Sequence, residues 1–218
     1  MRRVLMGGML CVVAMGTGAC AVNRADVDVD VNVSVNDGWV DLFNGEDLTG
    51  WTGGMEGAWI VEGGEIVTAK PGQGWWLRTN RMFRDFELEL EFWVPEGGNS
   101  GLGLRGSSGG DPAFTGFEVQ MLDTHGEAPG LRNCGAVYEA IAPSEMAVNK
   151  PDSWNTYRVK LVGDTLDVWL YGRHIHYSQL LEGRGLSLLH ILLCPRLSLC
   201  IFLCSPSYAN HITTFLLS

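Results

Sequence analysis

The sequence predicts an all-β protein in which short strands form a sandwich. From residue 39 onward, short runs of alternating apolar and polar residues are separated by turns rich in glycine, proline, asparagine and aspartate. This two-residue period is typical of strands with one buried face, and no long stretch shows the period of an amphipathic helix. The 29 glycines are spread through these runs, which fits tight turns rather than disorder. The spacing therefore favours a β-sandwich.

The length and charge limit what this sandwich does. A chain of 218 residues is long enough for one domain with terminal additions. The formal net charge is -10 at pH 7, and the first 20 residues contribute two arginines and no acid. An acidic surface argues against nucleic acid as a partner.

The first 20 residues are typical of a secretory signal. Arg2 and Arg3 precede an apolar run over residues 4–15, which is too short to span a membrane. The ending Gly-Ala-Cys20 resembles a bacterial lipobox, although Thr17 stands where leucine is commoner; the alternative is an ordinary cleaved signal. We expect export to the periplasm or outer cell envelope, with a lipid on Cys20 as the anchor and contact with the membrane through that lipid only.

Residues 21–38 form an acidic segment in which Asp, Asn and Val alternate. The segment lacks the glycine and the terminal glutamate of an EF-hand loop, so it is expected to be a solvated linker or an edge strand rather than a calcium site. The sandwich is then expected over residues 39–180. Its predicted strands are 57–62, 65–69, 75–79, 86–94, 101–105, 117–122, 135–138, 154–162 and 165–170.

Residues 181–218 form a hydrophobic tail of different character. From residue 186 to the end there is no acid and a single arginine or lysine, Arg196. Pro195 and Arg196 interrupt the apolar run, which is costly inside a bilayer. The two interpretations are a membrane anchor and residues translated out of frame, and the second is favoured because the alternation is lost. Of six cysteines only Cys134 lies in the sandwich, where a buried apolar role is expected.

The alternation assigns a face to each candidate residue. In strand 86–94 the apolar positions predict a buried face that leaves Glu89 outside, and in strand 117–122 they leave Glu118 and Gln120 outside. In strand 101–105 the same parity puts Arg105 on the outer side with Gly101 and Gly103, whose missing side chains would leave room for a sugar ring. Solvation alone is the alternative for each glutamate.

Other candidates lie near these strands. His125 follows strand 117–122, with Asp123 two residues earlier, and such a pair suits a general base oriented by a carboxylate, a metal ligand or an ordinary loop hydrogen bond. Trp75 and Trp76 must present one ring to each side of a strand, so one of them, Trp76 in our assignment, could stack on a sugar.

Several segments in order resemble the bacterial 3-keto-disaccharide hydrolase domain family over residues 39–177. The matching segments, as they stand in this sequence, are Trp39-Val-Asp-Leu-Phe-Asn-Gly, Leu48-Thr-Gly-Trp, Trp59-Ile-Val-Glu-Gly-Gly-Glu-Ile, Asp85-Phe-Glu-Leu, Asn99-Ser-Gly-Leu-Gly-Leu-Arg, Gly116-Phe-Glu-Val-Gln, Gly135-Ala-Val-Tyr and Trp154-Asn-Thr-Tyr. The resemblance implies a concanavalin A-like jelly-roll sandwich that cleaves glycosides oxidised at C3.

The implied chemistry gives each candidate residue a role. A C3 ketone acidifies the C2 proton, so a base removes it, a donor stabilises the enolate, and the glycosidic oxygen leaves C1 before water adds. By this resemblance His125 or Glu118 is the base, Arg105 stabilises the enolate and Asp123 orients His125. Gln120, Tyr138, Glu89 and Trp76 would bind the sugar. A divalent cation on such ligands is an open alternative that the spacing does not establish.

Two other functions remain open at this point, a non-catalytic carbohydrate-binding or adhesion lipoprotein on the same sandwich and a structural lipoprotein without a ligand. The chain departs from the family at its end, because members close with a glycine-rich strand and a further strand that the tail replaces. If those final strands are missing, the sheet beside the site has an open edge with unpaired backbone groups.

Overall fold

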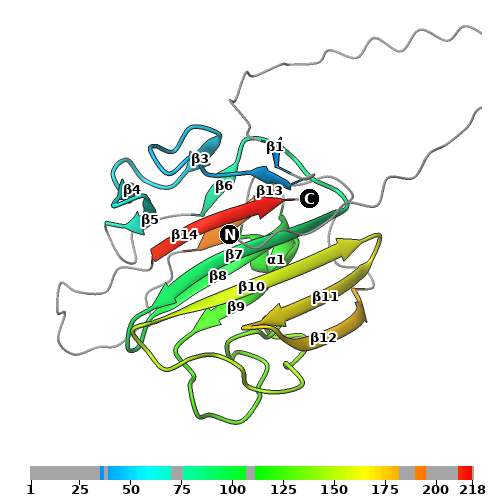
Figure 1. Cartoon of the computed structure of the whole chain (residues 1–218). Helices are drawn as coiled ribbons and strands as arrows, with labels where there is room; N and C mark the ends of the chain where they lie inside the picture. The colour runs from blue at the N-terminus through cyan, green and yellow to red at the C-terminus, as the bar shows by residue number, and fades with distance from the viewer. Residues whose placement is uncertain are drawn as a thin grey trace, which may run out of the picture.

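The chain folds into two facing β-sheets in a computed structural model that describes residues 35–36, 39–69, 76–106, 111–181, 190–194 and 211–217 (Figure 1). The predicted signal peptide 1–20, the lipidation at Cys20, most of the acidic segment and much of the tail lie outside the described residues and stay predictions. Within the described ranges, no helix has both the length and the apolar character needed to cross a membrane.

The larger sheet has the strand order β1-β2-β14-β7-β10-β11-β12, and β5, paired with β4, also joins β14. The smaller sheet has the order β3-β6-β13-β8-β9. The bounds of the elements are β1 Val35–Asn36, β2 Trp39–Asp41, β3 Trp51–Gly53, β4 Trp59–Glu62, β5 Glu65–Thr68, β6 Leu77–Thr79, β7 Phe86–Val94, β8 Asn99–Gly106, α1 Pro112–Thr115, β9 Phe117–Leu122, β10 Ser153–Val162, β11 Thr165–Leu170, β12 Arg173–Leu180, β13 His190–Cys194 and β14 His211–Leu217.

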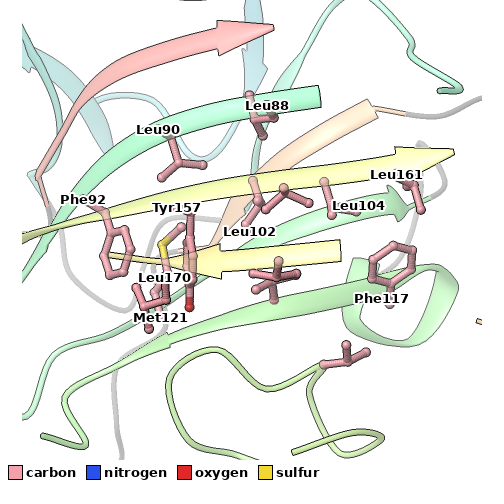
Figure 2. Close-up of a cluster of buried hydrophobic side chains, with 14 of the residues drawn as sticks. Leu88, Leu90, Phe92, Leu102, Leu104, Phe117, Met121, Tyr157, Leu161 and Leu170 are labelled. Atoms are coloured by element: carbon pink, nitrogen blue, oxygen red, sulfur yellow. The ribbon is translucent and has the colours of Figure 1, made fainter. Parts of the chain in front are cut away.

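The core lies between the sheets, and alternate residues of β7, β10 and β11 contribute to it. In β7 the buried positions alternate with glutamates, as the sequence predicts. The largest buried side chains belong to Tyr157, Phe92 and Phe117. Phe92 and Tyr157 stack with ring centroids 4.7 Å apart, and Figure 2 shows them beside Met121 at one end of the core, with Phe117 at the other. The all-β sandwich expected from the alternation is therefore confirmed.

Most predicted strands occur within two residues of their expected bounds, but three differences stand out. Residues 135–138 do not form a strand; only Val137 makes isolated bridges, to Val119 and to Ile141. Strand β12 is not predicted, because its sequence is polar and because shifts in its register with β11 bury Ile175 and His176 in succession. In the acidic segment, Val35–Asn36 forms the edge strand β1.

The tail supplies a strand to the interior of each sheet. Strand β13 pairs with β6 on one side and β8 on the other, and β14 pairs with β7 on one side and with β2 and β5 on the other. In Figure 1, β14 lies beside β7 and β13 lies in the sheet behind it. The open edge expected from the sequence is therefore absent from these described sheets. The tail sequence alternates too weakly to predict strands, yet β13 and β14 still satisfy the backbone hydrogen bonds of the strands beside them.

A long connection between β9 and β10 closes one side of the sandwich. It runs along β9, where Tyr138 N donates to Glu118 O at 2.9 Å. It then reaches β12 in the other sheet, where Ser144 N donates to Ile175 O at 3.0 Å. The connection therefore covers the edges of two sheets at once and brings Tyr138 beside β9.

We expect a chain ending at residue 187 to lose the native fold, because β13 and β14 are interior strands whose removal exposes a long unpaired edge on β7 and on β8. Near-ultraviolet circular dichroism and a urea unfolding curve measure this loss. The matched control is a chain starting at residue 38, which among the described strands lacks only the edge strand β1 and should unfold cooperatively. Cooperative unfolding of the shortened chain would contradict the interior placement of β13 and β14.

Candidate functional site

A row of residues crosses the outer face of the smaller sheet through Glu118. The register pairs Thr52 with Arg78, Arg78 with Leu192, Leu192 with Gly103, and Gly103 with Glu118. Directly paired residues of neighbouring strands project to the same side of a sheet. We call this set, with Tyr138, the Glu118 row.

Tyr138 extends the row past the last strand. The bridge between Val119 and Val137 and the hydrogen bond from Tyr138 N to Glu118 O place residue 138 opposite residue 118. The alternate residues Leu77, Leu102 and Val119 face the core and are at most 1% exposed. The Glu118 row therefore lies on the face that points away from the core.

Exposure decreases along the row toward Glu118. Thr52 is exposed, Arg78 and Tyr138 are half-buried, and Glu118 is only 1% exposed. A carboxylate removed from water is costly unless polar groups surround it. In the orientation that satisfies both its polar atoms, the Gln120 amide donates through Nε2 to Ser100 O at 2.7 Å and to Glu118 Oε1 at 3.3 Å. Gln120 therefore lies beside Glu118, and the backbone of Tyr138 lies opposite it.

The space above Gly101 is filled by Glu118 rather than left for a sugar ring. A Cβ atom built on Gly101 would lie 1.9 Å from Glu118 Oε1, so only glycine fits beneath this carboxylate. The expectation of an empty floor at Gly101 is wrong, because the side chain of the neighbouring strand folds over it. The glycine instead allows the carboxylate to lie flat against β8.

Trp76 lies beside this face. It immediately precedes β6, two residues before Arg78, and is 9% exposed. Its position fits the predicted side of the sheet, while its burial leaves little of the ring for stacking. Trp75 lies outside the described residues.

Arg105 does not lie on the Glu118 row, contrary to the parity prediction. Between His190 and Leu192 the register of β13 with β8 shifts, from Gly106 to Gly103, so β8 contains one extra residue. Arg105 has a left-handed backbone, with φ of 52°. Such a bulge re-aims the side chains on the bulged strand, which parity counting cannot detect.

The Arg105 side chain instead ties the two sheets together. Its guanidinium donates to Asp164 Oδ1 at 3.1 Å and to Gly163 O, both at the turn between β10 and β11. It also lies 3.9 Å from Asp85, before β7. Arg105 is 4% exposed, and this geometry gives it a structural role.

His125 and Asp123 are separately anchored. The exposed His125 ring donates from Nδ1 to Val148 O at 2.9 Å, which leaves Nε2 as the basic nitrogen. Asp123 Oδ2 accepts a hydrogen bond of 2.9 Å from Gly97 N in the turn before β8. The prediction that Asp123 orients His125 is wrong, because the carboxylate is used by that turn and Val148 orients the imidazole.

Glu89 lies on the other side of the molecule from Glu118. It belongs to β7 of the larger sheet and faces outward opposite Arg158, which bonds to Glu87 and lies 3.9 Å from Glu89. Partial burial raises the pKa of Glu89. The positive charge of Arg158 opposes this rise, and the negative charge of Glu87 adds to it. The alternation in β7 predicts that Glu89 faces outward, as it does. Alternation within a strand does not show to which sheet the strand belongs.

Arg78 is the residue of the row that sequence reasoning missed. The sequence did contain a signal for it. Leu77 and Thr79 are apolar or small and face inward, so the residue between them, Arg78, faces outward. In the described part of the chain, no group of three His, Cys, Asp or Glu side chains is placed to hold a metal ion. The outer face thus carries a buried carboxylate, Glu118, that accepts a hydrogen bond from the Gln120 amide, and a carboxylate can act as a base toward a polar organic ligand.

Cys134 has the buried role expected of it. The thiol is 0% exposed and lies 3.4 Å from Tyr157 Oη. Burial raises the pKa of the thiol to about 11, so it is protonated and unreactive at neutral pH.

Comparison with known proteins agrees with the resemblance seen in the sequence. A family model described as the 3-keto-alpha-glucoside-1,2-lyase-like domain matches residues 38–187. A 3-keto-disaccharide hydrolase of Bacteroides thetaiotaomicron is 35% identical over 77 residues, which cover 30% of this chain and 27% of that protein. The match thus spans about a quarter of the length of this relative.

Solved structures share the fold. Two candidate glycosyl hydrolases of Parabacteroides distasonis superpose with TM-scores of 0.66 and 0.67, at 22% and 20% identity. Each covers 83% of this chain, and 93% and 98% of the respective structure is matched.

Substitution of Arg105 by Met is expected to lower stability by about 2–4 kcal/mol, because the carbonyl of Gly163 loses a charged donor and the sheets lose a tie. Urea unfolding measures the change. The substitution Arg173→Met, at an arginine 59% exposed, is the control and should cost less than about 1 kcal/mol. Equal stability of both variants would contradict the structural role.

Acid should weaken the fold partly through His176, which is buried and donates from Nε2 to Gly135 O at 2.7 Å. Burial lowers the pKa of His176 from 6.5, against the opposing effect of that hydrogen bond. The unfolded chain then binds more protons below pH 6.5, so the free energy of unfolding falls as pH falls through this range. Urea titrations at several pH values should show a shallower dependence in His176→Gln, but not in the exposed control His125→Gln.

Proposed function

Because this chain belongs to the 3-keto-alpha-glucoside-1,2-lyase-like domain family, we propose that it acts on carbohydrates and cleaves glycosides whose sugar carries a ketone at C3. The observation that carries the proposal is the Glu118 carboxylate, held on the outer face of the smaller sheet beside Gln120. Family membership supports the carbohydrate class, and the position of the carboxylate supports the proton-transfer step.

The reaction begins with removal of the C2 proton by Glu118. The C–H electron pair moves into the C2–C3 bond and the ketone becomes an enolate. Return of the enolate electrons then expels the glycosidic oxygen from C1, which leaves with a proton and creates a C1–C2 double bond. Water adds across this bond, with its oxygen on C1 and a proton on C2, so the net result is hydrolysis.

Glu118 is a better candidate for the base than His125 at this row. Four residues of extended strand separate Glu118 from Leu122 at the end of β9, which corresponds to about 14 Å, and His125 lies beyond that end. A base must come within hydrogen-bond reach of the proton it removes. The His125 ring is bonded to Val148 O in the connection after β9, so Glu118 is the base proposed for this row.

Gln120 and Tyr138 are proposed to position the base and the sugar. The Gln120 amide donates to Glu118 Oε1 at 3.3 Å, which fixes the position of the carboxylate. The phenol of Tyr138, on the same row, supplies a hydroxyl that both donates and accepts. Sugar hydroxyls need such partners because binding removes their hydrogen bonds to water.

Glu118→Gln is expected to lower kcat by about 10²–10⁴-fold, since it removes the base and keeps the shape. The assay follows release of 4-nitrophenol from 4-nitrophenyl 3-keto-glucosides of both anomers. Glu91→Gln is the matched control, because Glu91 is an exposed strand glutamate on the outer face of the larger sheet, and its activity should equal that of the unaltered chain.

Three outcomes would count against this proposal. If the unaltered chain releases no product but retains binding to glycans, the protein is a carbohydrate-binding module. If it neither cleaves nor binds them, a structural role stands. If His125→Ala abolishes turnover while Glu118→Gln does not, the base has been wrongly assigned.

A further inference from the structure

We propose that the outer face of the larger sheet carries a second saccharide-binding site, centred on the exposed ring of Tyr177; its ligand class rests on the proposed function. The ligand is a neutral glucan, and its binding requires no ketone. The site is built on β10, β11 and β12, which run side by side at one edge of the larger sheet (Figure 1). Glu118 lies on the outer face of the smaller sheet, so the two sites lie on opposite sides of the molecule.

Four side chains form a stacked row across these three strands. The Arg158 guanidinium lies 5.0 Å from the centroid of the Trp169 ring. The His174 ring stacks on Trp169 with centroids 4.3 Å apart and planes 8° from parallel. Tyr177 ends the row, with its ring centroid 4.0 Å from that of His174. The register pairs Trp169 with Arg158, which lies opposite the outward-facing Glu89, so the row stands on the outer face.

Irregular pairing of β12 brings His174 and Tyr177 to the same side of the sheet. Residues three apart in a regular strand face opposite sides. The register of β12 with β11 shifts twice, between Leu166 and Val168 and again between Val168 and Trp169. Each shift inserts one extra residue into β12, and such bulges re-aim the side chains of the strand that contains them.

Asp167 holds this arrangement in place. Its Oδ1 atom accepts hydrogen bonds from His174 Nε2 at 2.8 Å and from Ser178 N at 2.9 Å. Ser178 has a left-handed backbone, with φ of 44°. A strained conformation of this kind persists only where its surroundings determine it, and such positions are common at binding sites. The Tyr177 ring is thus supported before a ligand arrives, which lowers the entropic cost of binding.

The row presents one flat ring with polar atoms beside it. Tyr177 packs against His174 and is still 58% exposed. Because His174 Nε2 donates to Asp167, Nδ1 is an acceptor, and none of the described residues donates to it. A sugar ring has C–H groups on its faces and hydroxyl groups around its edge. The tyrosine ring suits such a face, and its hydroxyl and His174 Nδ1 suit the hydroxyl groups.

The charges beside the row favour a neutral ligand. Arg158 bonds to Glu87 and lies 3.9 Å from Glu89. Lys160 is paired in the register with Glu87 on one side and with Asp167 on the other. Positive and negative groups therefore alternate on this part of the described surface. An anionic polymer or an anionic membrane surface would meet carboxylates beside each cation, whereas a neutral saccharide meets no such repulsion.

The test measures binding of cellohexaose and of maltohexaose by isothermal titration calorimetry. Neither probe carries a C3 ketone, so binding is measured without the proposed reaction. Tyr177→Ala should raise Kd for the bound probe at least about 10-fold, because it removes the ring face. Tyr177→Phe should change Kd by no more than about 3-fold, since it keeps the ring and loses one hydroxyl. Turnover of 4-nitrophenyl 3-keto-glucoside should be equal in Tyr177→Ala and in the unaltered chain.

Phe114→Ala is the matched control, because Phe114 is an aromatic residue 74% exposed in α1, which packs on β8 and β9 of the smaller sheet. Its Kd should equal that of the unaltered chain. Near-ultraviolet circular dichroism checks the fold of each variant. Should Tyr177→Ala unfold, Tyr177→Leu replaces it in the test, because leucine keeps an apolar side chain against His174 and removes the flat ring.

Four results would overturn this second site. They are absence of binding to both probes, an unchanged Kd in Tyr177→Ala, loss of binding in Glu118→Gln instead, and a dimer in sedimentation velocity that Tyr177→Ala converts to monomers. The last result would make this face a contact between two copies of the chain. Binding that depends on Tyr177 in a chain that releases no 4-nitrophenol would overturn the proposed reaction and leave this site standing.

Discussion

A single hydrogen bond across the core fixes the strand that carries the candidate base. Tyr157 in the larger sheet donates from its hydroxyl to Gln120 O in the smaller sheet at 2.6 Å, and both groups are buried. Apolar packing has no preferred direction and does not by itself fix the position of one sheet relative to the other. A buried donor that must meet its acceptor does fix that position. At the other end of the core, Arg105 makes the second tie. The backbone of β8 and β9 between these two ties carries Gly103 and Glu118, which are therefore held by the core rather than by the surface.

The two arginines of the smaller sheet's described strands show how one extra residue changes the direction of a side chain. Arg78 lies in a regular strand, where alternation turns it outward. Arg105 lies at a register shift, where its side chain reaches the other sheet. The bulge costs a strained backbone, since a left-handed arginine is unfavourable. Its bonds to the turn between β10 and β11 offset that cost.

Alternation in the sequence was enough to predict the sandwich and the buried sides of β7 and β9, because burial of one face requires a period of two. It could not place Glu89 and Glu118 on opposite sides of the molecule, since strand pairing depends on contacts distant in sequence. Sequence proximity also misled for Asp123 and His125, whose partners are Gly97 and Val148. The partners of these residues could not be predicted, because they lie far away in the sequence. The tail strands escaped prediction because their sequences, His-Ile-Leu-Leu-Cys and His-Ile-Thr-Thr-Phe-Leu-Leu, lack a regular two-residue alternation.

The late position of β13 and β14 in the chain has a consequence for how the protein is made. A polypeptide emerges from the ribosome amino end first, and these two strands fill the interior of sheets whose other members are synthesised earlier. Neither sheet can close until β13 and β14 have been synthesised, so contacts of large sequence separation contribute strongly to the folding barrier. Until then, β7 and β8 each expose an unpaired strand edge that can associate with other chains.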